Sequence, residues 1–82
     1  MNVPTHVRTV KTVDVAALYS AIGRAMKSAR ESRRMSQEQV GLALGMTRAN
    51  VANLEAGRGR ILVEHIYNAA LFLKVPIRKL LP

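Results

Sequence analysis

The chain has 82 residues, enough for one domain but too few for an enzyme with a separate cofactor module. Its 13 Lys and Arg residues against 5 Asp and Glu residues give a net charge of +8, and 49% of all residues are hydrophobic. This combination excludes a disordered basic tail and indicates a folded domain that binds a polyanion.

Aromatic residues make up only 4% of the chain, which disfavours proteins that stack single-stranded bases on aromatic rings and favours a duplex-DNA binder. The absence of cysteine excludes a disulfide framework and a thiolate zinc site. His6 and His65 stand apart from other candidate ligands, so we expect no metal, no other cofactor and no enzymatic activity. The longest apolar run, residues 69–73, is too short to cross a bilayer, and no apolar signal segment opens the chain. We therefore expect a soluble, cytoplasmic protein.

Residues 1–14 are expected to form an extended arm, because β-branched Thr and Val residues dominate positions 5–13 and Pro4 interrupts any early helix. Asp14 is a favourable N-cap for a helix over residues 15–33. Apolar residues recur on one face of this helix at spacings of three and four: Val15, Leu18, Ile22, Ala25, Met26 and Ala29. Its other faces are basic, since residues 16–35 contain five basic residues and one acidic residue and hold +4 of the total charge.

Residues 36–44 are predicted to form a short second helix. Ser36 and Gln39 have the spacing of a capping box, in which each side chain accepts a hydrogen bond from the backbone N–H of the other residue. Met35 and Val40 have the spacing of a hydrophobic staple at the same helix start. Gly45 then supplies the left-handed conformation that ends the helix.

A third helix, capped by Thr47, is expected to run to about Ala56 and to be closed by Gly57. A basic turn over residues 58–60 leads to a fourth helix, whose predicted buried stripe consists of Leu62, Ile66, Ala69, Ala70 and Leu73. After Pro76 the pattern predicts a last helical turn over residues 77–81. Because the chain ends one turn after the fold, we expect no appended ligand-binding domain.

Two short helices joined by a turn that contains Gly45 are typical of a helix-turn-helix. Over about residues 18–81 the chain resembles the phage-repressor and Cro type of helix-turn-helix domain, often called the XRE family. The resemblance rests on the run Arg30-x5-Ser36-Gln37-x2-Val40-Gly41-x2-Leu44-Gly45-Met46-Thr47-Arg48-x2-Val51-x2-Leu54-Glu55-x-Gly57-Arg58, followed by Ala70-x2-Leu73-x-Val75-x4-Leu80-Leu81. It implies an all-α, five-helix DNA-binding domain over residues 15–82, preceded by the short extended arm over residues 1–14. It also implies a sequence-specific transcriptional regulator, most simply a small repressor or autoregulator.

The third helix carries the candidate base-reading residues. Val51 and Leu54 are spaced to face the core, which leaves the opposite side free to enter a DNA groove. Arg can read a guanine edge, Asn an adenine edge, and an Ala methyl can meet the thymine methyl. We therefore predict base contacts from Arg48, Ala49, Asn50 and Asn53. Alternatively, Arg48 contacts only phosphate and Asn50 only supports the helix start.

The candidate phosphate-binding residues lie around the two short helices: Arg30, Ser36, Gln37, Thr47, Arg58 and Arg60. Helix N-termini present free N–H groups and the positive end of a dipole, which suits the positions at the starts of the second and third helices. The turn over residues 58–60 suits backbone or minor-groove contacts, and its alternative is a plain solvated loop. The family resemblance further implies that Arg30 pairs with Glu55, fixing the third helix against the first.

The chain departs from the family's pattern in three places, one of which is Leu42 and Ala43, at positions that are commonly polar. Gly41 stands where an Ala is usual, and a glycine inside a helix costs about 0.5 to 1 kcal/mol. The fourth helix carries more apolar residues than a monomer needs to hide, and we predict a dimer interface made of Val63, Tyr67, Leu71, Phe72 and Leu80. A two-fold homodimer would bind a palindromic operator with half-sites about one helical turn apart. The alternative cover for these residues is the arm, folded back over the fourth or the first helix.

Two rival functions remain open. The first is an antitoxin-like module that binds a partner protein through the apolar excess at Leu42, Val63, Leu71 and Phe72 and autoregulates secondarily. The second is an architectural duplex binder with little sequence preference, whose affinity would fall steeply with salt.

Overall fold

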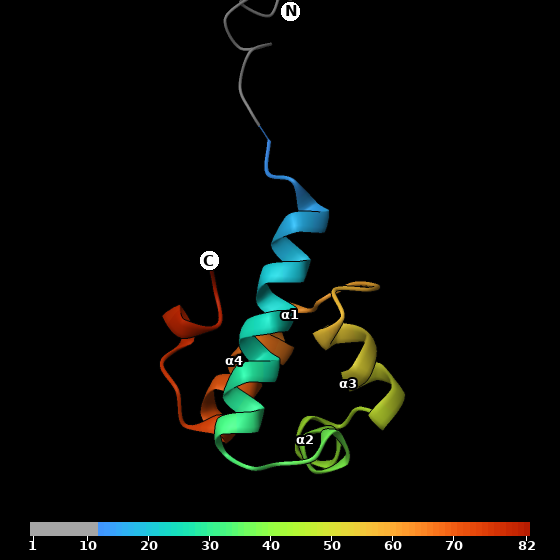
Figure 1. Cartoon of the computed structure of the whole chain (residues 1–82), viewed down its shortest axis with the longest axis vertical. Coiled ribbons are helices and arrows are strands. Elements are labelled where there is room, and N and C mark those ends of the chain that lie inside the picture. Colours follow the sequence, from blue (N-terminus) through green and yellow to red (C-terminus); the bar gives the residue numbers. More distant parts are fainter. Residues whose placement is uncertain (1–11) are drawn as a thin grey trace, which may run out of the picture.

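The computed structural model describes residues 12–82, so residues 1–11, most of the predicted arm, lie outside the described part. The described residues form four α-helices and one 3₁₀-helix: α1 (Val15–Ser32), α2 (Gln37–Leu44), α3 (Arg48–Glu55), α4 (Val63–Leu73) and η2 (Ile77–Lys79). Residues 12–82 contain no strand, and the predicted all-α class is confirmed. Figure 1 shows α1 as the long axis of the molecule, with α2 near its C-terminal end and α3 and α4 packed along it.

The helix boundaries follow local capping chemistry. The Asp14 side chain accepts a hydrogen bond from the N–H of Ala17 at 3.1 Å, which fixes the start of α1. The predicted capping box of α2 is present, with Ser36 N bonded to the Gln39 side chain at 2.8 Å and Gln39 N bonded to the Ser36 hydroxyl at 3.0 Å. Gly45 ends α2 with a φ of 67°, as its left-handed role requires.

The prediction of a fifth α-helix is wrong. Residues after Pro76 form one 3₁₀ turn, in which Lys79 N donates to Pro76 O and Leu80 N donates to Ile77 O, both at 2.9 Å. Pro82 follows closely, and the residue before a proline is disfavoured in the α conformation. The segment is therefore too short and too constrained to build a ladder of bonds four residues apart.

The hydrophobic core draws on every element: Ile22 and Met26 from α1, Val40 from α2, Val51 and Leu54 from α3, Ile66, Ala69, Ala70 and Leu73 from α4, together with Ile61 and Leu80. Val51 and Leu54 face inward as predicted. Val15 and Leu62 do not: Val15 lies on the N-terminal part of α1 that extends beyond the other helices, and Leu62 is the exposed N-cap residue of α4.

Two glycines allow the close helix packing. A Cβ at Gly23 of α1 would lie 2.7 Å from the carbonyl oxygen of Glu55 and closer still to that of Leu54, so only glycine lets α1 and α3 approach. A Cβ at Gly41 would lie 2.6 Å from the carbonyl oxygen of Met46. The departure at Gly41 is thus not only a cost to α2, because it permits the tight turn after this helix.

No helix within residues 12–82 combines the length and the apolar character that crossing a membrane requires.

Candidate nucleic-acid interface

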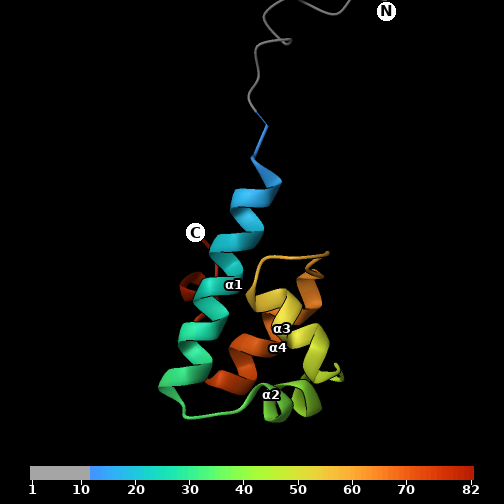
Figure 2. The same ribbon diagram turned by 45° about the vertical axis from the view of Figure 1, so that its right-hand side comes forward.

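One side of α3 faces the core and the other faces solvent. Val51 and Leu54 are buried, whereas all four predicted base-reading residues are exposed: Arg48, Ala49, Asn50 and Asn53. Figure 2 shows α2 and α3 at an angle to each other on one side of α1, the arrangement of a helix-turn-helix. The small Ala49 and Ala52 side chains keep this part of α3 slim, so the helix backbone can approach a groove closely.

A cluster of polar side chains fixes α3 on its buried side. Arg30 Nε lies 2.7 Å from Glu55 Oε2, and Arg30 Nη2 donates to Glu55 Oε1 at 3.0 Å, which makes the ion pair bidentate. Gln37 Nε2 also donates to Glu55 Oε1, at 3.1 Å, and Arg30 Nη1 donates to the carbonyl of Met35 at 2.8 Å. We call Arg30, Gln37 and Glu55 the clamp, because they join α1, α2 and α3.

The clamp is removed from bulk water, since only 11% of the Arg30 side chain and 5% of the Glu55 side chain are exposed. The hydrogen bonds to Glu55 raise the pKa of Arg30 above its ordinary value, so the guanidinium stays charged. Arg30 and Glu55, for which the family resemblance implied an ion pair, are therefore brought together. Such a pair sets the orientation of α3 relative to the rest of the fold.

The clamp engages the side chains of two predicted phosphate ligands, Arg30 and Gln37. Three N–H groups of Arg30 already bind Glu55 and Met35, and the side-chain N–H of Gln37 points inward to Glu55. The backbone N–H of Gln37 lies in the first turn of α2, where the helix itself offers no acceptor. At this end of α2, main-chain groups are thus better placed for an outside anion than the Gln37 side chain.

The remaining predicted phosphate ligands are exposed: Ser36, Thr47, Arg58 and Arg60. Thr47 caps α3, since its hydroxyl oxygen accepts a hydrogen bond from Asn50 N at 3.1 Å. Arg58 and Arg60 lie in the turn between α3 and α4, where Gly57 and Gly59 both have a φ of 75°.

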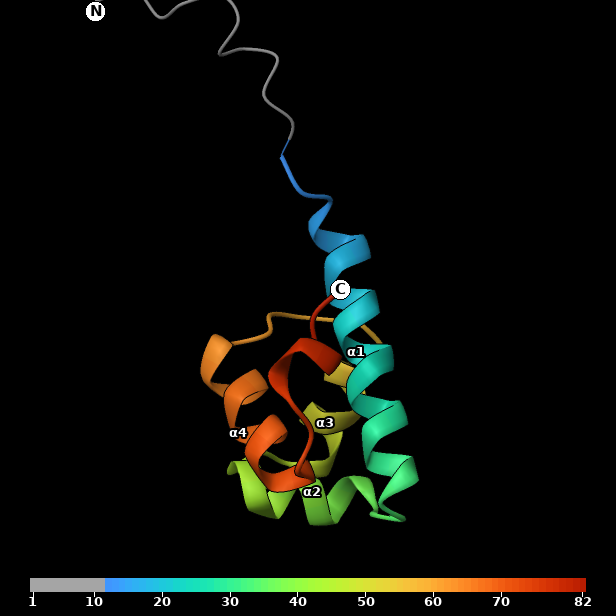
Figure 3. The same cartoon turned by 90° about the vertical axis from the view of Figure 1, so that its left-hand side faces the viewer.

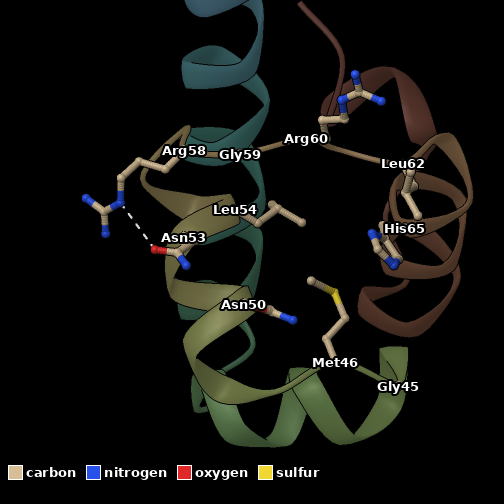
Figure 4. A pocket seen from close by; sticks show the side chains of 10 residues that line it. All are labelled: Gly45, Met46, Asn50, Asn53, Leu54, Arg58, Gly59, Arg60, Leu62 and His65. Carbon is tan, nitrogen blue, oxygen red and sulfur yellow. Dashed lines mark hydrogen bonds between the residues drawn. The ribbon is translucent and has the colours of Figure 1, made fainter.

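A surface hollow of about 430 Å³ lies beside α3. It is lined by Gly45, Met46, Asn50, Asn53, Leu54, Arg58, Gly59, Arg60, Leu62 and His65. Figure 4 shows that these residues come from α3, from the start of α4 and from the turns on either side of α3. His65 Nδ1 is buried without a hydrogen-bond partner among the described residues. Sequence reasoning missed the place of His65 in this wall, because an isolated histidine carries no spacing signal.

Arg58 and Asn53 are in direct contact, which the sequence did not predict. Arg58 Nε donates to Asn53 Oδ1 at 3.2 Å, drawn as the dashed line in Figure 4. The sequence predicts separate roles for them, a phosphate contact for Arg58 and a base contact for Asn53. The hydrogen bond makes them one unit at the C-terminal end of α3.

The predicted dimer residues divide into three groups. Val63, Tyr67 and Leu71 are 68%, 57% and 77% exposed and follow each other at intervals of four along α4. We call these three residues the α4 stripe. Phe72 is half-buried and packs against the core. Leu80 is fully buried, so its assignment to an interface is wrong; it directly follows η2, which packs against α4 (Figure 3).

Comparisons with known proteins agree with this geometry. A family model described as helix-turn-helix matches residues 26–80. A search of curated protein sequences gives no match. Among solved structures, a hypothetical transcription factor NHTF from Neisseria is 26% identical with a TM-score of 0.74, and the match covers 89% of this chain and 84% of that chain.

Two further structures are similar. The restriction-modification controller protein C.AhdI from Aeromonas hydrophila is 24% identical with a TM-score of 0.70, and the match covers 76% of this chain and 94% of that chain. This likeness shows the fold. The hydroxypropylphosphonic acid epoxidase from S. wedmorenis is 26% identical with a TM-score of 0.73, but the match covers 79% of this chain and only 35% of that chain.

Proposed function

Because the chain belongs to the helix-turn-helix family of the phage-repressor and Cro (XRE) type, whose model matches residues 26–80, it is a DNA-binding transcriptional regulator, and we propose that it acts as a sequence-specific homodimer. We propose further that it binds a palindromic operator and represses the promoter that the operator overlaps. The similar structure named as a hypothetical transcription factor supports a regulatory role.

The observation that carries the proposal is the outer face of α3. Arg48, Ala49, Asn50 and Asn53 are all exposed on it, while the clamp and two buried apolar residues fix the opposite face. A helix that is held rigidly and presents an Arg, two Asn and a small methyl can enter a major groove and read base edges. In this proposal, Thr47, Arg58 and Arg60 contact the flanking phosphates.

The α4 stripe supports the homodimer. Three large apolar side chains at intervals of four form a continuous exposed line, which costs free energy in water unless another surface covers it. A two-fold axis would place the same stripe of both copies together and would set two α3 helices about one DNA turn apart.

Selection from a pool of random duplexes by the purified chain tests the proposal. We expect enrichment of one palindromic sequence, bound by two copies of the chain as measured by sedimentation. The double variant Arg48→Ala and Asn53→Ala should lose the enrichment and keep weak binding to any duplex at low salt. Arg78→Ala, which removes an exposed charge on η2, serves as the control and should select the same sequence as the unchanged chain.

Two outcomes would contradict the proposal. Equal binding of all duplexes, with affinity that depends only on salt, would make the chain an architectural binder. Enrichment of a non-palindromic sequence, bound by a single copy of the chain, would contradict the homodimer but not the proposal that α3 reads bases.

A second candidate function is binding of a partner protein, with autoregulation as a secondary effect. The observation that favours it is Leu42, which is 80% exposed on α2 and lies on a different helix from the α4 stripe. A homodimer formed through α4 would not by itself require this residue to be apolar. Stable, stoichiometric binding of a purified partner that is lost in Leu42→Ser would support this function.

We also propose that the chain is not an enzyme. The similarity to the epoxidase covers about a third of that protein, so its activity does not transfer to this chain. A regulator of this kind needs no reacting group, because its effect comes from occupying a DNA site.

A further inference from the structure

We propose that Arg58 is a positioning residue that turns the Asn53 side chain so that Asn53 selects guanine rather than adenine. The inference rests on the proposed function, because it assumes that α3 reads bases in a major groove. It concerns the hydrogen bond between Arg58 Nε and Asn53 Oδ1, 3.2 Å long, at the C-terminal end of α3 (Figure 4).

The backbone brings the two side chains together. α3 ends in a Schellman turn, in which Arg58 N donates to Asn53 O at 2.9 Å and Gly57 N donates to Leu54 O at 3.0 Å. Gly57 takes the left-handed conformation that this turn needs, with a φ of 75°. In a Schellman turn, the two residues joined by the outer backbone hydrogen bond often share an apolar contact. In this chain those residues are Asn53 and Arg58, and their side chains form a hydrogen bond instead.

The chemistry of Arg58 dictates which end of the Asn53 amide faces it. A guanidinium group only donates hydrogen bonds, so the Asn53 atom that it contacts must be the acceptor oxygen. The amide nitrogen, Nδ2, then lies on the side away from Arg58, as Figure 4 shows, and no acceptor for it is found among residues 12–82. The side chain therefore offers two N–H donors outward.

This orientation matters for base recognition. An Asn that reads adenine uses both ends of its amide at once, accepting from N6 and donating to N7. While Oδ1 is held toward Arg58, one of its two lone pairs is occupied and the oxygen is less available to accept from adenine N6, whereas both N–H groups of Nδ2 stay free. Guanine offers only acceptors, N7 and O6, on the same major-groove edge, and these suit the free N–H groups of Asn53.

Binding of a duplex should strengthen the hydrogen bond. Asn53 and Arg58 are both exposed in the free protein, so water weakens their interaction. When DNA covers α3, the water leaves, and a hydrogen bond from a charged donor becomes stronger in the lower dielectric. The Nη groups of Arg58 remain available for the neighbouring phosphate, so positioning Asn53 and anchoring the DNA backbone are compatible.

The test compares base preference at one operator position among four proteins. Selection with Asn53→Ala first identifies the base pair that Asn53 contacts, as the position whose preference disappears. Affinities for duplexes with guanine or adenine at that position are then measured for the unchanged chain, Arg58→Ala and Arg58→Met. Arg58→Met keeps a long side chain without any donor. Arg60→Ala removes an equal charge from the same turn and is the control.

We expect the unchanged chain and Arg60→Ala to prefer guanine. In Arg58→Ala and Arg58→Met the Asn53 amide is free to turn, and the ratio of guanine to adenine affinity should fall about tenfold, the scale of one base contact. Both Arg58 variants and Arg60→Ala will also bind more weakly overall, because each loses a phosphate contact. The shift in ratio separates positioning from this general loss.

Folding is not expected to limit the test, since Arg58 is exposed and both Ala and Met at position 58 keep the backbone N–H of the Schellman turn. Melting temperatures of all variants check this point. Preference for adenine in the unchanged chain overturns the inference, as does an unchanged guanine preference in both Arg58 variants. If Asn53→Ala alters no position while Arg48→Ala still does, the inference fails and the proposed function stands. If the unchanged chain selects no sequence, the proposed function fails.

Discussion

α3 and α4 both bury one side in the same core, but their solvent-facing sides differ in chemistry. The exposed side of α3 carries polar and small residues, whereas that of α4 carries the α4 stripe of Val63, Tyr67 and Leu71. The buried sides of both helices carry apolar residues, because both pack into that core. The exposed sides are not constrained by packing, so their difference supports the proposal that the two helices meet different partners, a DNA groove at α3 and an apolar protein surface at α4.

The two helices are also held differently. α3 is short and depends on the clamp and on close contact with Gly23 of α1. α4 is longer and is fixed by apolar burial, with Ile66, Ala69 and Leu73 all in the core. Changes to polar groups should therefore affect α3 and its DNA binding most, while changes to apolar groups should affect α4 and the stability of the fold.

The largest expected effect comes from breaking the clamp. Glu55→Ala leaves the charge of Arg30 without its partner in a mostly buried place and should lower the free energy of unfolding by about 3 to 5 kcal/mol. DNA affinity should fall with it, because α3 loses its attachment to α1. Urea denaturation and DNA titration measure the two effects. Glu64→Ala, an exposed carboxylate on α4, should change the free energy of unfolding by less than about 0.5 kcal/mol. A stable Glu55→Ala variant with unchanged affinity would disprove the role of the clamp.

The next largest effect tests whether Leu80 belongs to the core or to an interface. Leu80 is fully buried in the hydrophobic core, so Leu80→Ala should lower the free energy of unfolding by about 2 to 5 kcal/mol. The neighbouring Leu81 is 42% exposed, so Leu81→Ala should cost clearly less in the same denaturation experiment. Loss of self-association without loss of stability in Leu80→Ala would instead return this residue to an interface.

A smaller effect concerns the outer face of α3. Arg48→Ala should weaken binding to the selected operator by about 1 to 3 kcal/mol and change binding to random DNA little, because a base contact acts only on the matching sequence. Titrations with both duplexes measure the difference, and Arg78→Ala on η2 is the control. Equal losses on both duplexes would mean that Arg48 contacts phosphate alone.

The smallest effect concerns the α4 stripe. Leu71 is 77% exposed, so Leu71→Ala should leave the free energy of unfolding of the protomer within about 0.5 kcal/mol of its original value. Self-association should weaken about tenfold, because a large apolar contact is lost. Leu42→Ala, at a leucine of similar exposure on α2, is the matched control for sedimentation. Weaker association in the control alone would move the interface from α4 to α2.

Much of the fold could be predicted because helix ends depend on neighbouring residues. The capping box at Ser36, the left-handed Gly45 and the Thr47 cap all act within about four residues, so the sequence shows them directly. The inward placement of Val51 and Leu54 followed from helical periodicity. The fifth helix failed because a short apolar pattern after a proline does not distinguish one 3₁₀ turn from an α-helix.

The sequence predicted only part of the candidate site. The exposed residues of α3 followed from periodicity, and the contact of Arg30 with Glu55 followed from the family resemblance. The hydrogen bond of Arg58 to Asn53 was missed because the two side chains meet only when the Schellman turn folds back on α3.

The sequence by itself determined the charge, the family and the starts and ends of the helices. All of these depend on composition or on hydrogen bonds between near neighbours in the chain. Tertiary structure alone decided that Leu80 is buried, that Gly23 and Gly41 permit close backbone approach, and that Asn53 faces Arg58. The physical reason is that burial and side-chain contact depend on which elements pack together, and residues far apart in the chain settle that packing.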